Sequence, residues 1–225
     1  LERLRGARGM IDSDTYVAPR SVEAAHRAAG AAQALAEGLL DGVASTGVAM
    51  VRPPGHHAEP ARAMGFCLLN NAAVAAMAAH RRGVERVAII DIDVHHGNGT
   101  QAIFLSDPDT LYLSIHQFPF YPGTGAIEER GVGEGLGATV NIPLSEGAND
   151  PTYGEAARTI VVPTLLDFHP GLVLISAGFD AYMGDPLASM VLTPDGYSRV
   201  VSAIVDAGEQ LGAPVGMVLE GGYDL

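Results

Sequence analysis

The chain has 225 residues, of which 48% are hydrophobic, and its formal net charge at pH 7 is −13. This length fits one domain with a substantial hydrophobic core. Gly, Pro or charged residues interrupt every apolar run before it reaches the roughly 20 residues that a membrane helix needs. The acidic balance argues against general nucleic-acid binding, which needs an excess of basic residues. It favours cationic ligands, although an acidic surface also serves solubility alone.

Cysteine content and the chain ends bear on location and completeness. Cys67 is the only cysteine, so an internal disulfide is excluded, and no basic and apolar leader is present. These features predict a cytoplasmic location. The chain begins with Leu1 and stops at Leu225 directly after a predicted strand. We therefore expect a single domain over residues 1–225 that is truncated at both ends.

Helices and strands are predicted to alternate along the chain. In order, they are a helix at Ser21–Leu40 with Ser21 as N-cap, a strand at Gly47–Val51, a helix at Asn70–Arg82, strands at Arg86–Ile92 and Thr110–Ile115, an extended surface loop at Gly123–Gly147, a helix at Pro151–Phe168, a strand at Gly171–Ser176, a helix at Pro194–Leu211 and a strand at Pro214–Leu219. Continuous apolar strands indicate burial on both faces. This order predicts an α/β fold with a mainly parallel sheet, which places ligands beyond the carboxyl ends of its strands.

The most informative segment is DIDVHHGNG at positions 91–99, which follows an apolar strand. In a strand, Asp91, Asp93 and His95 share one face, whereas Ile92 and Val94 point to the other. Two carboxylates and an imidazole in a dry site need a cation or hydrogen-bond donors to balance them. The pattern therefore favours a divalent metal over a polar strand end that caps a following helix.

A second apolar strand ends in Ala177-Gly178-Phe179-Asp180. Alone, Asp180 is more typical of a helix cap, but beside Asp93 and His95 we expect it to complete a metal site. Three protein ligands leave coordination positions open, as catalytic metals require. A metal with open positions polarises a carbonyl and lowers the pKa of bound water, which is the chemistry of hydrolysis.

Two more strand ends carry reactive side chains. The turn RPPGHHAE at positions 52–59 presents His56 and His57. Paired imidazoles suit general acid and base chemistry, metal ligation or a structural role, and the residues alone leave these three readings open. After the last strand, two glycines precede Tyr223, whose phenol can donate a hydrogen bond to an oxyanion.

Six motifs taken together resemble the ordered signature of the histone deacetylase and acetylpolyamine amidohydrolase family, especially its bacterial class II-like members. They are RPPGHHA at 52–58, GFC at 65–67, DIDVHHGNGTQ at 91–101, PGTG at 122–125, AGFD at 177–180 and EGGYDL at 220–225. The resemblance implies a three-layer α/β/α arginase/deacetylase fold and a deacetylase catalytic domain. It also implies zinc at Asp93, His95 and Asp180, with iron(II) or cobalt as alternatives.

The same resemblance implies roles around the metal. His57 would be the general base and acid, His56 its electrostatic partner, and Tyr223 the donor that polarises the scissile carbonyl. Asp91 would lie behind His56, and Asn98 behind His57, where some relatives carry an aspartate. An amide stabilises a protonated imidazole less than a carboxylate does, so this departure bears on the pKa of His57.

Substrate and ion contacts are implied as well. Gly65, Phe66 and Tyr121 would wall a narrow tube for an aliphatic amine chain, and Asp14 would be the acid at its rim. A structural potassium ion is implied near a set of mostly backbone oxygens, at Asp91, Asp93, His95, Ser114 and Ile115.

The implied activity is removal of acetyl or other short acyl groups from acetylated lysine side chains or related amines. An acetylpolyamine deacetylase is an alternative, although the segment Gln117–Gly125 is shorter than the loop that polyamine-specific relatives carry. A module that binds acylated ligands without turnover is a second alternative, against which the complete ligand set and Tyr223 argue. A two-manganese, arginase-like hydrolase would need more carboxylates. The oligomeric state is not predicted.

Overall fold

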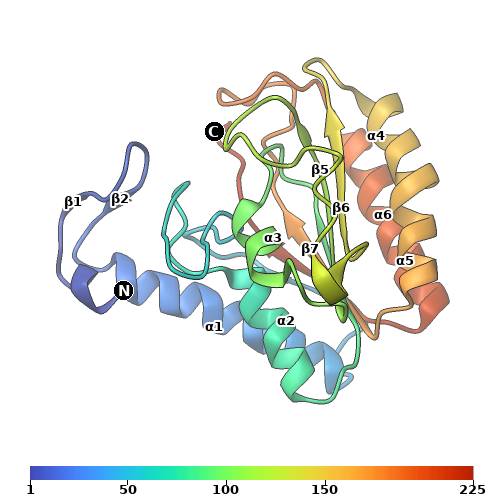
Figure 1. Cartoon of the computed structure of the whole chain (residues 1–225), viewed down its shortest axis with the longest axis horizontal. Helices are drawn as coiled ribbons and strands as arrows, with labels where there is room; N and C mark the ends of the chain where they lie inside the picture. The colour runs from blue at the N-terminus through green and yellow to red at the C-terminus, as the bar shows by residue number, and fades with distance from the viewer. Residues whose placement is uncertain (225) are drawn as a thin grey trace.

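Six parallel strands form the centre of the structure, which is a computed structural model that describes residues 1–224 (Figure 1). Their order across the sheet is β3 (Thr46–Ala49), β8 (Val215–Leu219), β7 (Leu172–Ala177), β4 (Val87–Asp91), β5 (Thr110–Gln117) and β6 (Thr139–Leu144). All neighbouring pairs are parallel. The predicted α/β fold with a mainly parallel sheet is confirmed.

Helices cover both faces of the sheet and make three layers (Figure 1). One face packs against α1 (Ser21–Leu40) and α2 (Asn71–Arg81), and the other against α4 (Asp150–Ala156), α5 (Val162–Phe168) and α6 (Pro194–Leu211). In β4, Val87 and Ile89 enter the first core, while Ala88 and Ile90 enter the second. A strand that serves two cores reads as a continuous apolar run.

The chain order places a site between β4 and β7. From β4 the chain continues through β5 and β6 to one edge, and then returns to β7 and β8 on the other side of β4. At such a switch point, loops leave neighbouring strands in opposite directions and open a crevice at their carboxyl ends. The segments that follow Asp91 and Ala177 border this crevice.

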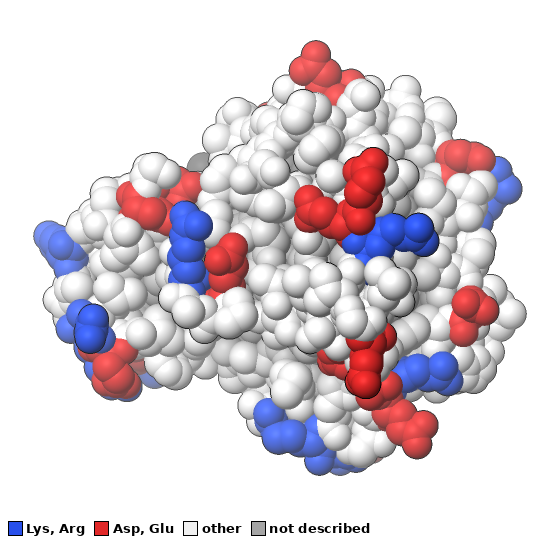
Figure 2. All heavy atoms as spheres, viewed as in Figure 1, with Lys and Arg blue, Asp and Glu red and all other residues white. Residues whose placement is uncertain are grey.

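Several short elements lie outside the sheet. They are η1 (Glu2–Leu4), the antiparallel pair β1 (Gly9–Met10) and β2 (Tyr16–Val17), α3 (Asn98–Phe104) and η2 (Gly133–Gly135). The β1–β2 hairpin projects from the body of the molecule near the start of α1 (Figure 1). Among the described residues, no helix is both long and apolar enough to span a membrane. On the face in Figure 2, basic side chains lie in small groups among acidic ones.

The expectation of a continuous surface loop at Gly123–Gly147 is wrong in part, because β6 lies within it. β6 is an edge strand that pairs only with β5, and Pro143 stands opposite His116. Proline removes a ladder hydrogen bond, which an edge strand tolerates. Its polar residues and proline therefore explain why a prediction based on apolar runs did not find this strand.

Two helix details also differ from the sequence prediction. Ser21 is not an N-cap, since α1 has Arg20 in that position and the Ser21 hydroxyl accepts a hydrogen bond from Ala18 N–H instead. The predicted helix Pro151–Phe168 is divided by a π-helical segment, η3 (Ala157–Val161). Pro163 lacks the N–H that would close the α-helical ladder there, which explains the widened turn.

Helix α6 has the predicted bounds and gives a test of local stability. Thr193 Oγ1 accepts a hydrogen bond from Gly196 N–H and donates one to Asp150. We expect Thr193→Ala to lower the free energy of unfolding by about 1 kcal/mol in chemical denaturation. Ser198→Ala, at an exposed position of the same helix, should change it by less than about 0.5 kcal/mol. Equal effects would contradict the capping role.

Candidate metal and catalytic site

Three side chains meet at the crevice between β4 and β7. Asp93 and His95 follow β4, Asp180 follows β7, and one ligand atom from each lies within 4.8 Å of the others. His95 Nδ1 is 3.1 Å from both Asp93 Oδ1 and Asp180 Oδ2. Ile92 and Val94 point into the core of the opposite face, as the strand alternation predicted.

Backbone groups hold the two carboxylates in place. Asp93 Oδ2 accepts a hydrogen bond of 2.9 Å from Gly221 N–H, and Asp180 Oδ1 accepts one of 2.9 Å from Val94 N–H. A Cβ atom at Gly221 would collide with both carboxylates. The segment after β8 therefore approaches the group as closely as only glycine allows.

The electrostatics of this group favour a cation. Burial alone would lower the pKa of His95, but the hydrogen bonds to Asp180 and Asp93 outweigh it and raise that pKa to about 10. Burial and the charge of Asp93 raise the pKa of Asp180 to about 6. Two buried carboxylates and an imidazole nitrogen suit a divalent ion of the zinc type, which would supply the positive charge that the group attracts.

The tandem histidines lie beside this group with opposite electrostatics. Burial lowers the pKa of His56, but the charges of Asp93 and Asp91 prevail and hold it well above its usual value. Burial and the charge of His56 hold the pKa of His57 well below its usual value. Their ring centroids are 4.0 Å apart. These opposite shifts favour a charged His56 beside a neutral His57.

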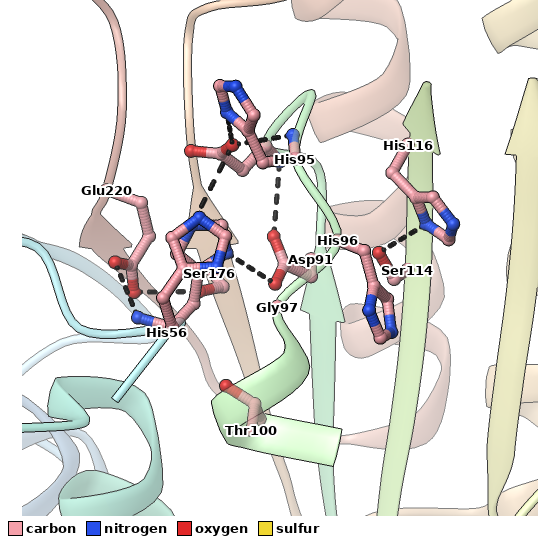
Figure 3. A network of polar contacts seen from close by, with 12 residues as sticks. His56, Asp91, His95, His96, Gly97, Thr100, Ser114, His116, Ser176 and Glu220 are labelled. Atoms are coloured by element: carbon pink, nitrogen blue, oxygen red, sulfur yellow. Dashed lines mark hydrogen bonds and ion pairs between the residues drawn. The ribbon is translucent and has the colours of Figure 1, made fainter. Parts of the chain in front are cut away.

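Each histidine has the partner that the resemblance implied. His56 Nδ1 donates to Asp91 Oδ2 at 3.1 Å (Figure 3). Asp91 also accepts a hydrogen bond from Tyr112 OH. His57 Nδ1 donates to Asn98 Oδ1 at 2.8 Å. Since a neutral imidazole carries one N–H, a proton on Nδ1 leaves Nε2 with a free lone pair.

Glu220 anchors the turn that carries the histidines. Its carboxylate is fully buried and accepts hydrogen bonds from Gly55 N–H, His56 N–H and Ser176 Oγ (Figure 3). A Cβ atom at Gly55 would collide with the backbone at Asn71, so this turn is packed tightly against the start of α2. These contacts connect the ends of β3, β7 and β8.

A narrow cavity of about 180 Å³ opens over the site. Eight of the residues that line it were predicted from the sequence: Asp14, His56, His57, Gly65, Phe66, His95, Tyr121 and Tyr223. Three more, Pro54, Phe120 and Leu187, were not predicted. Phe120 directly precedes the predicted Tyr121, and its ring stacks on His95 at 5.3 Å between centroids. The lining therefore combines an apolar wall with imidazole and phenol groups.

The wall segment around Phe66 is held in an unusual conformation. Phe66 has φ +66°, in a region that large side chains seldom adopt. Its N–H donates to Thr15 Oγ1, and Gly65 N–H donates to Asp14 Oδ1. A Cβ atom at Gly65 would collide with the His57 ring. Asp14, predicted at the rim, thus lies at the cavity and also supports its wall.

Tyr223 faces the same cavity from the segment after β8. Its ring contacts Phe66 at 5.8 Å between centroids, and its N–H donates to Asp185 Oδ2 at 2.7 Å. Burial and the charges of Asp93 and Asp180 raise the pKa of Tyr223 above its usual value. The phenol therefore stays protonated and can donate a hydrogen bond.

The residues predicted for potassium lie together on the neighbouring strands. Asp91 stands opposite Ser114 in the β4–β5 register, and Ile115 follows it in β5. Ser114 Oγ contacts His116 Nδ1 at 2.9 Å. The grouping is compatible with an ion site, and potassium itself stays a prediction.

Fold and site together place the chain among α/β proteins with a candidate metal site at the carboxyl edge of a parallel sheet. The profile of the histone deacetylase domain matches residues 2–225. Histone deacetylase 15 of Arabidopsis thaliana is 48% identical over 217 residues, which are 95% of this chain and 39% of that protein. The histone deacetylase-like amidohydrolase of Pseudomonas aeruginosa is 44% identical over 220 residues, 96% of this chain and 57% of that protein.

The crystal structure of the HDA15 HD domain superposes with a TM-score of 0.94 and 45% identity, covering 99% of this chain and 64% of that one. The chain belongs to the histone deacetylase family. It spans 39% of the Arabidopsis protein and 57% of the Pseudomonas protein.

Close packing at Gly221 gives a test of the metal site. We expect Gly221→Ala to lose most bound metal, because the added methyl group would displace Asp93 and Asp180. Metal per chain after zinc loading and dialysis would be measured by atomic emission. Gly30→Ala in α1, where nothing lies within 4 Å of the added atom, is the matched control. A folded Gly221→Ala protein with full metal content would refute this account of the site.

Proposed function

We propose that this chain is a zinc-dependent amidohydrolase, which removes acetyl or other short acyl groups from acetylated lysine side chains or related amines. One observation carries the proposal: the neutral His57, the carboxylate and imidazole group at His95, and the phenol of Tyr223 border one narrow cavity. The names of the relatives, which are deacetylases and an amidohydrolase, support it.

Asp93, His95 and Asp180 would hold the zinc ion, and iron(II) or cobalt would fit the same ligands. When bound, such an ion polarises a carbonyl and lowers the pKa of water. A divalent charge at this place would also lower the pKa of the neighbouring His57 further, in the direction that the protein already imposes.

His57 is the proposed general base and acid. Its free Nε2 takes a proton from the attacking water while the water oxygen bonds to the acyl carbon. His57 then gives the proton to the amine nitrogen as the C–N bond breaks, which releases the free amine and a carboxylic acid. His56 is unsuited to this role because its high pKa keeps it protonated at neutral pH. Its positive charge instead stabilises the negative charge that develops in the transition state.

Tyr223 and the cavity wall complete the proposed site. The Tyr223 phenol donates a hydrogen bond to the carbonyl oxygen as that oxygen gains charge. Phe66, Tyr121 and Leu187 contact the alkyl chain of the substrate, and Asp14 binds a polar group at the rim. A potassium ion beside Asp91 and a cytoplasmic location remain part of the proposal.

The short segment Gln117–Gly125 favours a protein or general deacylase over a polyamine-specific enzyme. Acetate release from an acetyl-lysine peptide and from acetylated putrescine, before and after chelation and with zinc restored, tests the activity and ranks the two substrates. We expect turnover of the peptide, its loss on chelation and its recovery with zinc. A folded, metal-loaded protein that releases acetate from neither substrate would contradict the proposal and favour a binding module.

The role of Tyr223 has its own test. We expect Tyr223→Phe to lower kcat by a factor of about 100 or more, as loss of a hydrogen-bond donor to an oxyanion does, while the metal content stays unchanged. Tyr182→Phe, on the segment after β7, controls for loss of a phenol. Full activity in Tyr223→Phe would exclude the proposed role.

A further inference from the structure

We propose that Glu59 is a positioning residue for the general base: its carboxylate orients the Asn98 amide and thereby sets which nitrogen of His57 carries the proton. This inference rests on the proposed function and deepens it, because it explains how a base works behind an amide where some relatives have a carboxylate.

The three side chains form a continuous series of hydrogen bonds. His57 Nδ1 lies 2.8 Å from Asn98 Oδ1, and Asn98 Nδ2 lies 2.8 Å from Glu59 Oε1. His57 and Asn98 are buried, with 4% and 6% of their surface exposed, whereas Glu59 is half-buried. The series thus runs from the cavity to the protein surface.

An amide at position 98 must be held in one orientation, whereas a carboxylate need not be. The oxygen and NH2 group of Asn98 occupy similar positions, and the amide can be placed either way round. With its oxygen toward His57, Nδ1 donates and Nε2 keeps the lone pair that a base needs. With the NH2 group toward His57, Nδ1 must accept and the proton moves to Nε2. A carboxylate presents an oxygen in both orientations, so it needs no directing group.

Glu59 fixes the orientation of the Asn98 amide. An ionised carboxylate only accepts hydrogen bonds, so the NH2 group of Asn98 must face it and the oxygen must face His57. Met64 Sδ, 3.4 Å from Asn98 Nδ2, is a second acceptor on the same side. Both neighbours of the NH2 group therefore favour the orientation in which Nε2 of His57 is free.

The backbone keeps this series in register. Glu59 N–H donates to Arg62 O at 2.9 Å, which holds the turn that carries the carboxylate. Thr100 N–H donates to His56 O at 3.1 Å, and a Cβ atom at Gly99 would collide with the backbone of Ala58. The two segments pack without room for a side chain, so the Asn98 amide and Glu59 stay within reach.

Other groups around His57 are common to all the variants considered below. They are His56 on the same turn, Asp93 and His95 beyond β4, and the Tyr121 ring across the cavity. The charges of His56 and His95 lower the pKa of His57, and that of Asp93 raises it. Since these groups do not change, differences among the variants report the Glu59 and Asn98 pair.

The test compares Glu59→Ala, Asn98→Asp and the double variant. We expect Glu59→Ala to lower kcat by about 10- to 100-fold, by analogy with the loss seen when the hydrogen-bond partner of a metal-binding histidine is removed, with KM and metal content nearly unchanged. The double variant should recover most of this activity, because Asp at position 98 orients His57 without help. Glu59→Gln, whose oxygen can still accept from Asn98, should lose less than Glu59→Ala.

Glu37→Ala is the matched control, since Glu37 also accepts a hydrogen bond from a side-chain amide, that of Gln33 at 2.7 Å, within α1 and away from the cavity. We expect wild-type kinetics for it. Glu59→Leu, which retains more side-chain volume, provides the same comparison if the Ala variant does not fold.

A direct readout that needs no turnover is the ¹⁵N NMR spectrum of histidine-labelled protein, in which the shifts of the two ring nitrogens identify the protonated one. The wild type should carry the proton on Nδ1 of His57, and Glu59→Ala should show a mixture. Unchanged kcat and an unchanged His57 tautomer in Glu59→Ala would overturn the inference. So would a finding that Glu59→Ala lowers kcat by the same factor in the Asn98→Asp variant as in the wild type. If the wild type hydrolyses neither substrate, the proposed function fails, and the tautomer measurement still decides the role of Glu59.

Discussion

Buried negative charge at the carboxyl edge of the sheet is the constraint on which the rest of the site depends. Asp91, Asp93, Asp180 and Glu220 are all fully buried, and they come from the ends of three adjacent strands. An unpaired buried carboxylate is costly, so each must find donors or a cation. Backbone N–H groups, Ser176 and a protonated imidazole meet part of this need. A divalent ion of the proposed kind would meet the remainder.

The same constraint separates the two histidines. His56 lies next to Asp91 and Asp93 and is held protonated by them, whereas His57 lies next to a neutral amide and to the positive His56. Adjacent residues of one type thus acquire opposite protonation states from their surroundings. The proposed division of labour between a charged His56 and a neutral base, His57, would follow from this asymmetry. It would require that the turn at Gly55 hold both rings in place.

Much of this architecture could be predicted from the sequence, because it depends on local pattern. Buried strands such as β4 and β7 appear as apolar runs, and polar residues directly after them identify the sheet edge at which Asp93 and Asp180 meet. β6 was not predicted, because an edge strand that contains Pro143 lacks that pattern. The roles of His56 and His57 could not be separated from the residues alone, since they depend on partners 35 and 41 positions away.

Contacts of Glu220 and Glu59 illustrate the harder part of the problem. Glu220 bonds to a turn 165 residues earlier in the chain, and nothing in its local sequence indicates that pairing. Glu59 follows the histidine pair by two residues and reads as an ordinary acidic residue at the end of a turn. Its proposed role depends on Asn98, because an amide presents an oxygen at one end and an NH2 group at the other, whereas a carboxylate presents an oxygen at both. When an amide replaces the carboxylate behind His57, a third residue, Glu59, is needed to fix the orientation of that amide. This residue can be found only from the folded structure, where the three side chains lie together.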